Sequence, residues 1–472
     1  MTETPLRQAA SPGLRQNSVG VAGMVFMVVA ATAPLTAMAS NLSLSLGLGV
    51  GSGTLGWLLI VGVLLAVFTT GYVALSRRVV NAGAYYAFIG FGLGRSAGSA
   101  AAFIAGIAYN MAAAAMAAAT GYFASIGFAT YFDVHLGWYV YAAVALAVVW
   151  ALGFFGVRIA SRATAVICVT QFLLLAVLAV AILVRQPGGF TFEGYSPSVM
   201  FDGNYALALV FCMLSFAGYE AAAIYGEECA APGRSIKRAT YLALALLIVV
   251  FLFSTWSLVA AFEDVATAAQ EDPGTLVMRA AQHYLGSWAV VAISLLLAVS
   301  FLAASVSFHN MAARYHFSLS RAGLLPRKLS VVHRRFGTPA AASLVQIVVC
   351  VVVLLPFVLT GMDPLTNLFP AVSGVTSLAV TGLMAGAAIS AAVASFRGIL
   401  PGGAWPVRVA PMVAAAGLIA IGVIIVLHYR EVTGSDSGYV AFMPAILVVG
   451  AAYGAIAQRR RRDVQLEAHL QE

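Results

Sequence analysis

The stretch "SFAGYEAAAIYGEE", residues 215–228, places one carboxylate well inside a long apolar segment. A charged side chain at the centre of a membrane-spanning helix costs about 2.5–3.5 kcal/mol or more on insertion scales. Glu220 therefore needs a partner or a role at that depth. Gly218 weakens the helix two residues before it, and Ser215 can bond backbone groups that a break leaves free. We expect an interrupted helix here, with its break at residues 217–218.

The composition places this segment in a membrane. Hydrophobic residues make up 62% of the 472 residues and charged residues only 9%, against about 25% charged in a typical soluble domain. Apolar runs of about 20 residues recur along the chain, and each is long enough to cross about 30 Å of hydrocarbon. The sequence therefore predicts an all-α polytopic membrane protein.

Twelve membrane-spanning helices are expected. They divide the chain into a cytoplasmic N-terminal tail (1–18), a ten-helix core (19–392), helices eleven and twelve (393–457) and a cytoplasmic C-terminal tail (458–472). The predicted spans are 20–45, 54–76, 97–126, 138–157, 164–185, 204–228, 239–262, 284–308, 340–360, 366–392, 409–428 and 438–457.

The charge distribution gives the orientation. With both ends of the chain in the cytoplasm, 22 of the 25 lysines and arginines fall on the cytoplasmic side, and the outer loops are acidic. The net charge of +8 is therefore explained by topology in a cell membrane, and we expect no nucleic-acid partner. One alternative concerns residues 19–34, which also resemble the apolar part of a secretory signal peptide.

Two segments between the predicted spans also have a recognisable pattern. The segment "NAGAYYAFIGFGLGR" (81–95) is too broken to span and predicts an interfacial or re-entrant helix on the cytoplasmic side. Residues 309–339 predict a long basic loop after span eight. Glu227 and Glu228, at the end of span six, are expected to reach the cytoplasmic surface.

A second interruption is predicted in span one. In "VVAATAPLTAMAS" (28–40), Pro34 lacks an N–H and clashes with the carbonyl four residues earlier, so the helix must kink or unwind. At about 1.5 Å per residue, residues 20–31 cover about 18 Å and residues 219–228 about 15 Å, which places both breaks near the bilayer midplane. Broken helices at corresponding positions of two halves indicate a transporter binding site and a 5+5 inverted repeat, here inferred from segment order. The alternative is that both residues merely kink packed helices.

The physics of such breaks suggests a ligand. Free N–H groups at the start of the inner half of span six match a carboxylate, and free carbonyls at the end of its outer half match an ammonium group. A zwitterion is matched by both, which favours amino acids or amines.

At these residues the sequence resembles the amino acid–polyamine–organocation (APC) superfamily of permeases, which have the LeuT-type fold. The motifs that carry the resemblance are "SFAGYEAAAIYGEECAAPGRSIKRA" (215–239), "RYHFSLSRAGLLPRKLSVVHRRFGTPAAA" (314–342) and "NAGAYYAFIGFGLG" (81–94), and with the span count it covers about residues 20–457. The resemblance implies a secondary transporter that works by alternating access, usually coupled to protons or to exchange.

The resemblance also implies where the substrate binds. Its carboxyl and amino groups are expected at the broken parts of spans one and six, with Tyr109 and Asn110 of span three as a wall. The residues implicated at the two breaks are Ala31, Thr32, Ala33, Pro34, Ser215, Phe216, Ala217, Gly218 and Tyr219.

Two departures from the family pattern bear on coupling and substrate. Span one has A-T-A-P where many relatives have a glycine-rich break, and Gln171 stands where many have a lysine. Gln171 cannot titrate, so Glu220 is the remaining coupling candidate; burial favours its protonated form and the half-helix N-terminus its ionised form. Ser305 and Ser307 of span eight leave a sodium site open as an alternative to proton coupling.

Two alternatives to an amino-acid permease stay open. A polyamine or cation carrier would use Glu220 to bind the substrate's charge, and a non-transporting sensor would use none of these features. We expect no enzyme, no cofactor and no metal centre, because no triad, P-loop or zinc motif occurs and "GLGVGSG" (47–53) follows no strand. The four cysteines are far apart and are expected to be small core residues.

Overall fold

The structure is a computed structural model that describes residues 19–81, 83–155, 157–229, 232–433, 442–460 and 469–470. Within these residues, ten segments are long and apolar enough to cross a membrane. The predicted N-terminal tail (1–18) lies outside the described residues, as do residues 461–468 and 471–472 of the predicted C-terminal tail (458–472).

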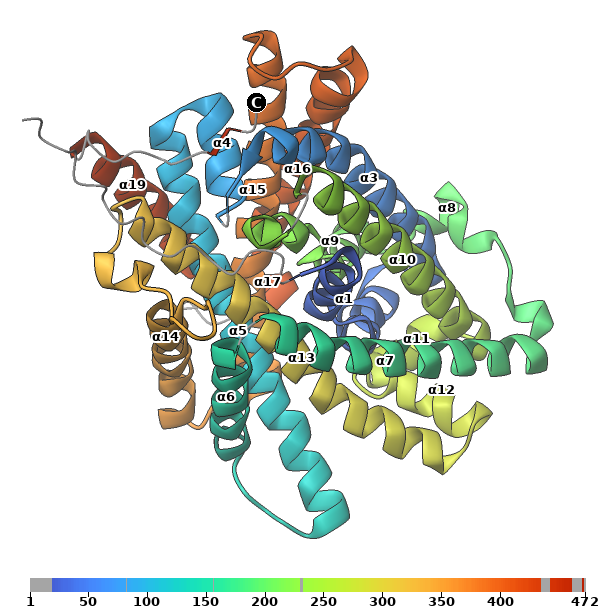
Figure 1. Ribbon diagram of the computed structural model, residues 1–472. Helices are drawn as coiled ribbons and strands as arrows, with labels where there is room; N and C mark the ends of the chain where they lie inside the picture. Colours follow the sequence, from blue (N-terminus) through green and yellow to red (C-terminus); the bar gives the residue numbers. More distant parts are fainter. Residues whose placement is uncertain are drawn as a thin grey trace, which may run out of the picture.

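Helices form nearly all of the described chain (Figure 1). The α-helices are α1 (Val21–Thr32), α2 (Pro34–Ala37), α3 (Thr54–Arg78), α4 (Tyr85–Leu93), α5 (Arg95–Phe132), α6 (Trp138–Phe155), α7 (Val157–Arg185), α8 (Pro197–Met200), α9 (Tyr205–Ser215), α10 (Pro232–Ala261), α11 (Val265–Glu271), α12 (Leu276–Tyr284), α13 (Ser287–Arg321), α14 (Ala340–Leu359), α15 (Phe369–Phe396), α16 (Ala410–Leu427), α17 (Tyr429–Thr433) and α19 (Ala445–Arg460).

Shorter π and 3₁₀ segments and two strands complete the described elements. They are η1 (Met38–Leu42), η2 (Ser45–Val50), η3 (Gly51–Gly53), η4 (Pro187–Gly189), η5 (Glu193–Tyr195), η6 (Tyr219–Glu228), η7 (Arg327–Ser330), η8 (Pro364–Leu368) and η9 (Trp405–Val409), with β1 (Val79–Val80) antiparallel to β2 (His469–Leu470).

The predicted spans correspond to these elements with two differences in how they are joined. The first apolar segment, Val21–Arg78, runs through 58 residues and contains both predicted spans one and two. The last, Ala445–Arg459, is shorter than the other ten, and residues 434–441 before it are not described. The count of twelve therefore stays a prediction.

The structure selects between the two alternatives for one predicted connection and changes the other. α4 is buried against α5 and α15, so the segment 81–95 enters the bundle, which fits the re-entrant alternative and not the interfacial one. α13 continues to Arg321, so the first part of the predicted loop 309–339 is helical. Both outcomes have one cause: aromatic side chains such as Tyr85, Tyr315 and Phe317 are almost fully buried between helices, which local sequence does not reveal.

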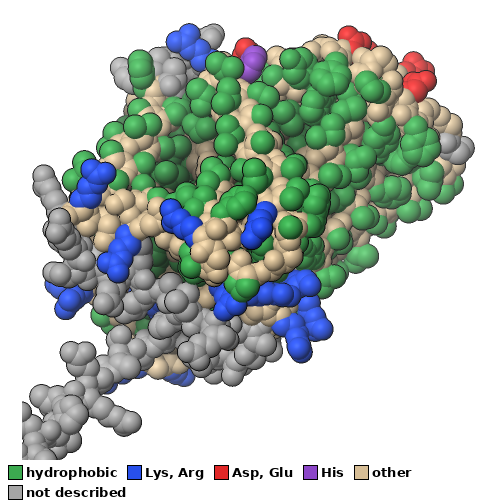
Figure 2. All heavy atoms as spheres, turned by 90° about the horizontal axis from the view of Figure 1, so that it is seen from above, with side chains coloured by type: hydrophobic (Ala, Val, Ile, Leu, Met, Phe, Trp, Pro, Cys, Tyr) green, Lys and Arg blue, Asp and Glu red, His purple; other side chains and the backbone are tan. Residues whose placement is uncertain are grey.

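The outer surface of the bundle is apolar. Large hydrophobic side chains are exposed along α6, α7, α14 and α16, for example Val144 at 59% and Val352 at 62%. Figure 2 shows this hydrophobic surface between most of the visible Lys and Arg at one end and most of the visible Asp and Glu at the other. We call these the basic end, which includes Arg77, Lys237, Arg321, Lys328 and Arg397, and the acidic end, which includes Glu193, Asp202, Glu263, Asp264 and Glu431.

The two interrupted segments lie at the centre. α1 packs against α7, α10, α13 and η6, and Figure 1 shows it surrounded by the other helices. Residues 27–39 are all buried, as are residues 218–226. The breaks are therefore brought together in the core of the molecule.

Candidate functional site

The break in span one occurs at Ala33. Its backbone is left-handed (φ 44°), between the end of α1 and the start of α2 at Pro34. Because Pro34 has no N–H and Leu35 donates its N–H to Gln171 Oε1 (3.4 Å), the carbonyls of Ala30 and Ala31 have no helical donor. The end of α1 thus presents carbonyl oxygens that can accept a hydrogen bond. At the start of α2, the side chain of Gln171 from α7 already accepts the N–H of Leu35.

The break in span six occurs at residues 216–218, and so begins one residue before the predicted 217–218. Gly218 has φ 100°, and a Cβ there would lie 2.9 Å from the Cβ of Ala31, so only glycine fits both the conformation and the contact. The second half is a 3₁₀ helix over ten residues, not the expected α-helix. A 3₁₀ helix rises about 2.0 Å per residue instead of about 1.5 Å, so this half is longer and thinner than expected.

Glu220 is fully buried at the start of this 3₁₀ segment. Its Oε2 accepts the N–H of Gly218 (3.1 Å), and its Oε1 accepts the hydroxyl of Tyr109 (3.0 Å). The hydroxyl of Tyr72 donates to the Glu220 carbonyl (2.6 Å). The N–H groups that were expected to await a ligand are thus used inside the protein, because Ala217 and Tyr219 also donate theirs to nearby carbonyls.

A small cavity of about 50 Å³ lies between the two breaks. Of the predicted binding residues, Ala31, Thr32 and Ala217 line it. The other predicted residues surround the breaks without lining this cavity, namely Ala33, Pro34, Ser215, Phe216, Gly218, Tyr219, Tyr109 and Asn110.

Most of the cavity wall was not predicted. Its apolar side includes Ala112 and Met116 of α5, Phe308 of α13 and Phe369 of α15. Its polar side consists of six residues, Thr32, Thr36, Ser40, Asn41, Ser373 and Thr376. One sequence feature could have indicated part of this wall. Small and polar residues follow Pro34, and the helix segments that contain them line the cavity.

Three other candidates have partners elsewhere. Asn110 donates from Nδ2 to the carbonyl of Gly106 (2.6 Å) and lies 2.9 Å from Nε2 of His316. Ser305 donates to the carbonyl of Ala113 (3.2 Å), so its hydroxyl joins α13 to α5. The Ser307 hydroxyl donates within its own helix.

A larger vestibule of about 340 Å³ adjoins the cavity. Thr36, Ser40, Asn41 and Ser373 line both spaces. The vestibule extends to Pro273, Gly274 and Glu431, so it leads toward the acidic end.

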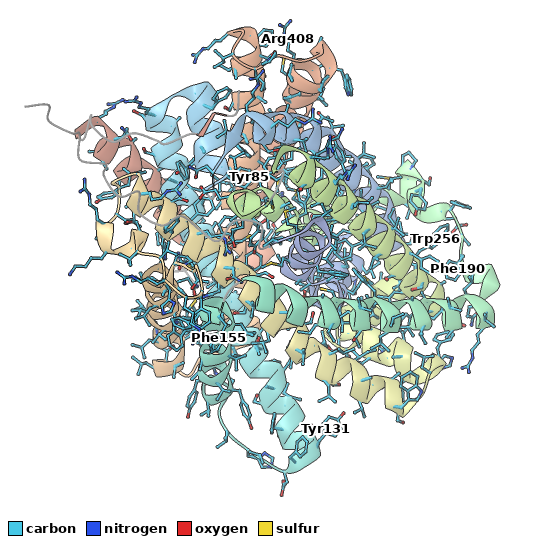
Figure 3. All side chains as sticks on the ribbon, viewed as in Figure 1. Tyr85, Tyr131, Phe155, Phe190, Trp256 and Arg408 are labelled. Atoms are coloured by element: carbon cyan, nitrogen blue, oxygen red, sulfur yellow. The ribbon has the colours of Figure 1, made fainter. Side chains whose placement is uncertain are left out.

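The way to the basic end is closed by packed side chains. Rings of Tyr72, Tyr85, Tyr109 and Tyr315 are fully buried and in contact, with Tyr109 and Tyr315 centroids 5.3 Å apart. Figure 3 shows Tyr85 inside the bundle. Within the described part of the chain, the cavity therefore adjoins a vestibule toward the acidic end and meets packed rings toward the basic end.

Two ion pairs lie beyond these rings. Glu228 Oε1 accepts from Arg314 Nη2 (2.5 Å) and Nε (2.7 Å), and both side chains are 4% exposed. Glu227 pairs with both terminal nitrogens of Arg321 (3.0 Å each). The expectation that these glutamates reach the surface is wrong for Glu228, which Arg314 of the helical extension of α13 buries. Glu227 stays partly exposed beside Arg321.

Comparisons with known proteins agree with this architecture. A family model described as "Amino acid permease" matches residues 19–452. Uncharacterised transporters of Mycobacterium tuberculosis and Mycobacterium bovis are each 31% identical over 131 residues, which is 28% of this chain and 29% of the relative. The match spans less than a third of the length of these curated relatives.

Solved structures share the fold. The Eremococcus coleocola manganese transporter, crystallised with an aromatic bis-isothiourea substituted compound, has a TM-score of 0.60 at 13% identity, over 97% of this chain and 99% of that chain. A variant of the same transporter has a TM-score of 0.61 at 15% identity over the same shares. At this identity the likeness establishes the fold, that of LeuT-type transporters. Together with the match over residues 19–452, it follows that the chain belongs to the amino acid permease family, within the APC superfamily.

Proposed function

We propose that this protein is a secondary active transporter of amino acids or related amines that works by alternating access. The observation that carries the proposal is the cavity between the two broken helices, open toward one end of the molecule and closed by tyrosines and ion pairs toward the other. We propose transport without catalysis and without a cofactor.

The cavity wall favours a substrate without a large net charge. The lining residues, all within the described chain, include no Asp, Glu, Lys, Arg or His. The open carbonyls at the end of α1 suit an ammonium group, since the end of a helix carries a partial negative charge. A volume of about 50 Å³ holds on the order of a few water molecules, which suits the head group of an amino acid.

The same wall argues against two other cargoes. A manganese ion, the cargo named for the solved neighbour, is held by oxygen ligands that usually include carboxylates, and this lining supplies none. A polyamine would place two or more charges in the site, whereas Glu220 lies outside the lining and is bonded to Tyr109 and Gly218. A polyamine or cation carrier therefore ranks below an amino-acid transporter and is kept as the second candidate.

The proposal includes the finer architecture expected from sequence: twelve spans, a 5+5 inverted repeat, and both ends of the chain on the cytoplasmic side of the cell membrane. The positions of the two breaks support the repeat. The separation of the basic and acidic ends supports the orientation. In this orientation the vestibule faces outward.

We propose proton coupling or exchange. Glu220 is the buried titratable group beside the cavity, and its bonds to the break link its protonation to the conformation of η6. Gln171 lies at the other break but cannot carry a proton. The Ser305 hydroxyl is used by Ala113, which weighs against the alternative of a sodium site.

The deciding experiment is uptake into proteoliposomes. Labelled amino acids, putrescine and manganese are supplied with an imposed proton gradient, a sodium gradient, or a preloaded lumen. We expect accumulation of neutral amino acids driven by protons or by exchange. Uptake of putrescine alone would support the second candidate, and uptake of none of these would revive a non-transporting sensor.

A matched pair of variants connects uptake to the cavity. Ala217→Leu fills a space of about 50 Å³ and is expected to abolish uptake. Ala420→Leu makes the same change on an exposed position of α16 and is expected to leave uptake unchanged. Equal uptake by both variants would place the substrate elsewhere.

A further inference from the structure

We propose that Asn41 and Ser373 bind the carboxylate of the substrate. This inference rests on the proposed function and adds the residues that recognise one half of the zwitterion. Neither residue was implicated by the sequence, and both line the cavity and the vestibule.

A carboxylate needs hydrogen-bond donors, and the backbone at the two breaks does not offer them. The N–H of Gly218 is taken by Glu220, and the N–H of Leu35 is taken by Gln171. Pro34 has no N–H. At the start of the inner half of span six, where free N–H groups were expected, the N–H groups of Ala217, Gly218 and Tyr219 are all used. The end of α1 presents carbonyls, which accept hydrogen bonds and repel a carboxylate.

The hydroxyls of the cavity wall are used as well. A hydroxyl has one hydrogen to donate. Four of the six polar side chains in the wall donate theirs to main-chain carbonyls. These are Thr32 to Val29 (2.9 Å), Thr36 to Ala33 (2.6 Å), Ser40 to Thr36 (2.6 Å), and Thr376 to Ala108 (3.2 Å) and Val372 (3.1 Å).

The two remaining side chains, Asn41 and Ser373, make no side-chain hydrogen bond to another described residue. Asn41 belongs to η1, the continuation of the broken first span, and Ser373 belongs to α15. Both are partly exposed to the cavity and vestibule, and both stand where these two spaces join. A ligand that enters from the vestibule meets these donors before it reaches the open carbonyls of α1.

Their chemistry matches a carboxylate. The amide of Asn41 offers two N–H donors and the hydroxyl of Ser373 one O–H donor, so the pair can satisfy both oxygens without adding a charge to the wall. With the ammonium group at the carbonyl of Ala31, which lines the cavity, the zwitterion would be held by donors at one end and an acceptor at the other. The substrate class is thus neutral amino acids with a free carboxylate.

The test compares free acids with their carboxamides, which keep the ammonium group but lack the anionic carboxylate. Binding is measured as protection of the purified protein against thermal unfolding, and transport as uptake into proteoliposomes. The probes are L-alanine with L-alaninamide and L-phenylalanine with L-phenylalaninamide. Asn41→Ala and Ser373→Ala are expected to weaken binding of the acid about tenfold or more, as for a hydrogen bond to a charged group, and to change binding of the carboxamide little.

Two further variants make the result specific. Asn41→Asp should bind the carboxamide better than the acid, because a carboxylate in the wall repels another. Ser40→Ala, next in the chain and lining the same spaces, removes a hydroxyl already bonded to Thr36 and should leave the preference for the acid unchanged.

Loss of acid and carboxamide binding to the same extent in Asn41→Ala, or an equal effect of Ser40→Ala, would overturn the assignment while leaving the proposed function intact. A wild-type protein that neither binds nor carries any amino acid would overturn the proposed function and this inference with it.

Discussion

At the scale of single residues, Glu220 shows how a carboxylate is kept in the middle of a membrane protein. The Gly218 N–H and the Tyr109 hydroxyl each occupy one of its oxygens. The glutamate lies in the first turn of η6, where a helix N-terminus stabilises an anion. Its burial is compensated by these bonds and not by a cation.

Replacing Glu220 by Gln tests the coupling role. Gln can accept from the Gly218 N–H with its oxygen and donate to the Tyr109 oxygen with its nitrogen, so we expect stability close to that of the wild type. It cannot titrate, so proton-driven accumulation should be lost while exchange persists. Uptake by the two proteins is compared across pH.

Tyr109→Phe is the matched control, because it removes one bond to the same carboxylate and keeps the titratable group. An unchanged pH dependence of uptake in the Gln variant would remove Glu220 from the coupling mechanism.

Gly218→Ala is expected to destabilise the protein. A left-handed backbone costs a non-glycine residue about 1–2 kcal/mol, and the added Cβ would come within 2.9 Å of the Ala31 Cβ. Thermal unfolding in detergent should therefore begin at a lower temperature, and uptake should fall. Gly382→Ala on α15, where no atom lies within 4 Å of the added Cβ, should be neutral. Equal unfolding temperatures for both variants would contradict the steric argument.

At the scale of elements, η6 is held to α13 by the two ion pairs near the basic end. The Glu228–Arg314 pair is almost fully buried, and the Arg314 guanidinium also lies 4.8 Å from the centre of the Tyr225 ring. A 3₁₀ segment of ten residues is long for this poorly bonded helix, and such stretches mark hinges. We infer that the Glu228–Arg314 pair stabilises the inner half of span six in its closed position.

Removing one charge of the Glu228–Arg314 pair should lower the stability of the protein more than removing both charges. Arg314→Gln removes the arginine from the buried Glu228, and breaking one side of a buried pair typically costs about 3–5 kcal/mol. The double variant Glu228→Gln with Arg314→Gln should recover much of that stability but open the basic end more readily. The exposed pair Glu271–Arg279 provides the control, and its neutralisation should cost about 0–1 kcal/mol.

The reactivity of the Cys229 thiol, next to Glu228, can be used to measure opening of the basic end. Burial, with a smaller effect of the Glu228 charge, raises the pKa of the Cys229 thiol to about 12, so little reactive thiolate exists at neutral pH in the closed protein. Opening exposes the thiol and returns its pKa toward the ordinary value, so maleimide labelling should accelerate in the double variant. Labelling at the wild-type rate would mean that the pair does not hold this end closed.

At the scale of the whole molecule, the apolar exterior and the separated charges determine how the protein sits in a bilayer. Exposed valines and leucines on α7, α14 and α16 cannot be left in water but suit lipid. The basic and acidic ends then lie on opposite sides of the membrane.

The orientation can be tested with two cysteine substitutions on exposed residues. Glu263→Cys lies at the acidic end and Lys328→Cys at the basic end. A membrane-impermeant maleimide added to intact cells should label the first at once and the second only after permeabilisation. The four native cysteines are buried and should contribute little background. The reverse order of labelling would invert the topology.

The sequence alone determined the helical membrane architecture, the two breaks and their family, because long apolar runs, a proline, a glycine and a buried carboxylate act locally on the backbone. The tertiary structure decided how the polar groups around those breaks are used. It assigned the Gly218 N–H to Glu220, the Leu35 N–H to Gln171, and left Asn41 and Ser373 for a ligand. The bonds of Tyr109 and Gln171 join residues 111 and 136 positions apart, and such pairings depend on how helices pack. Short-range sequence pattern carries no information about that packing.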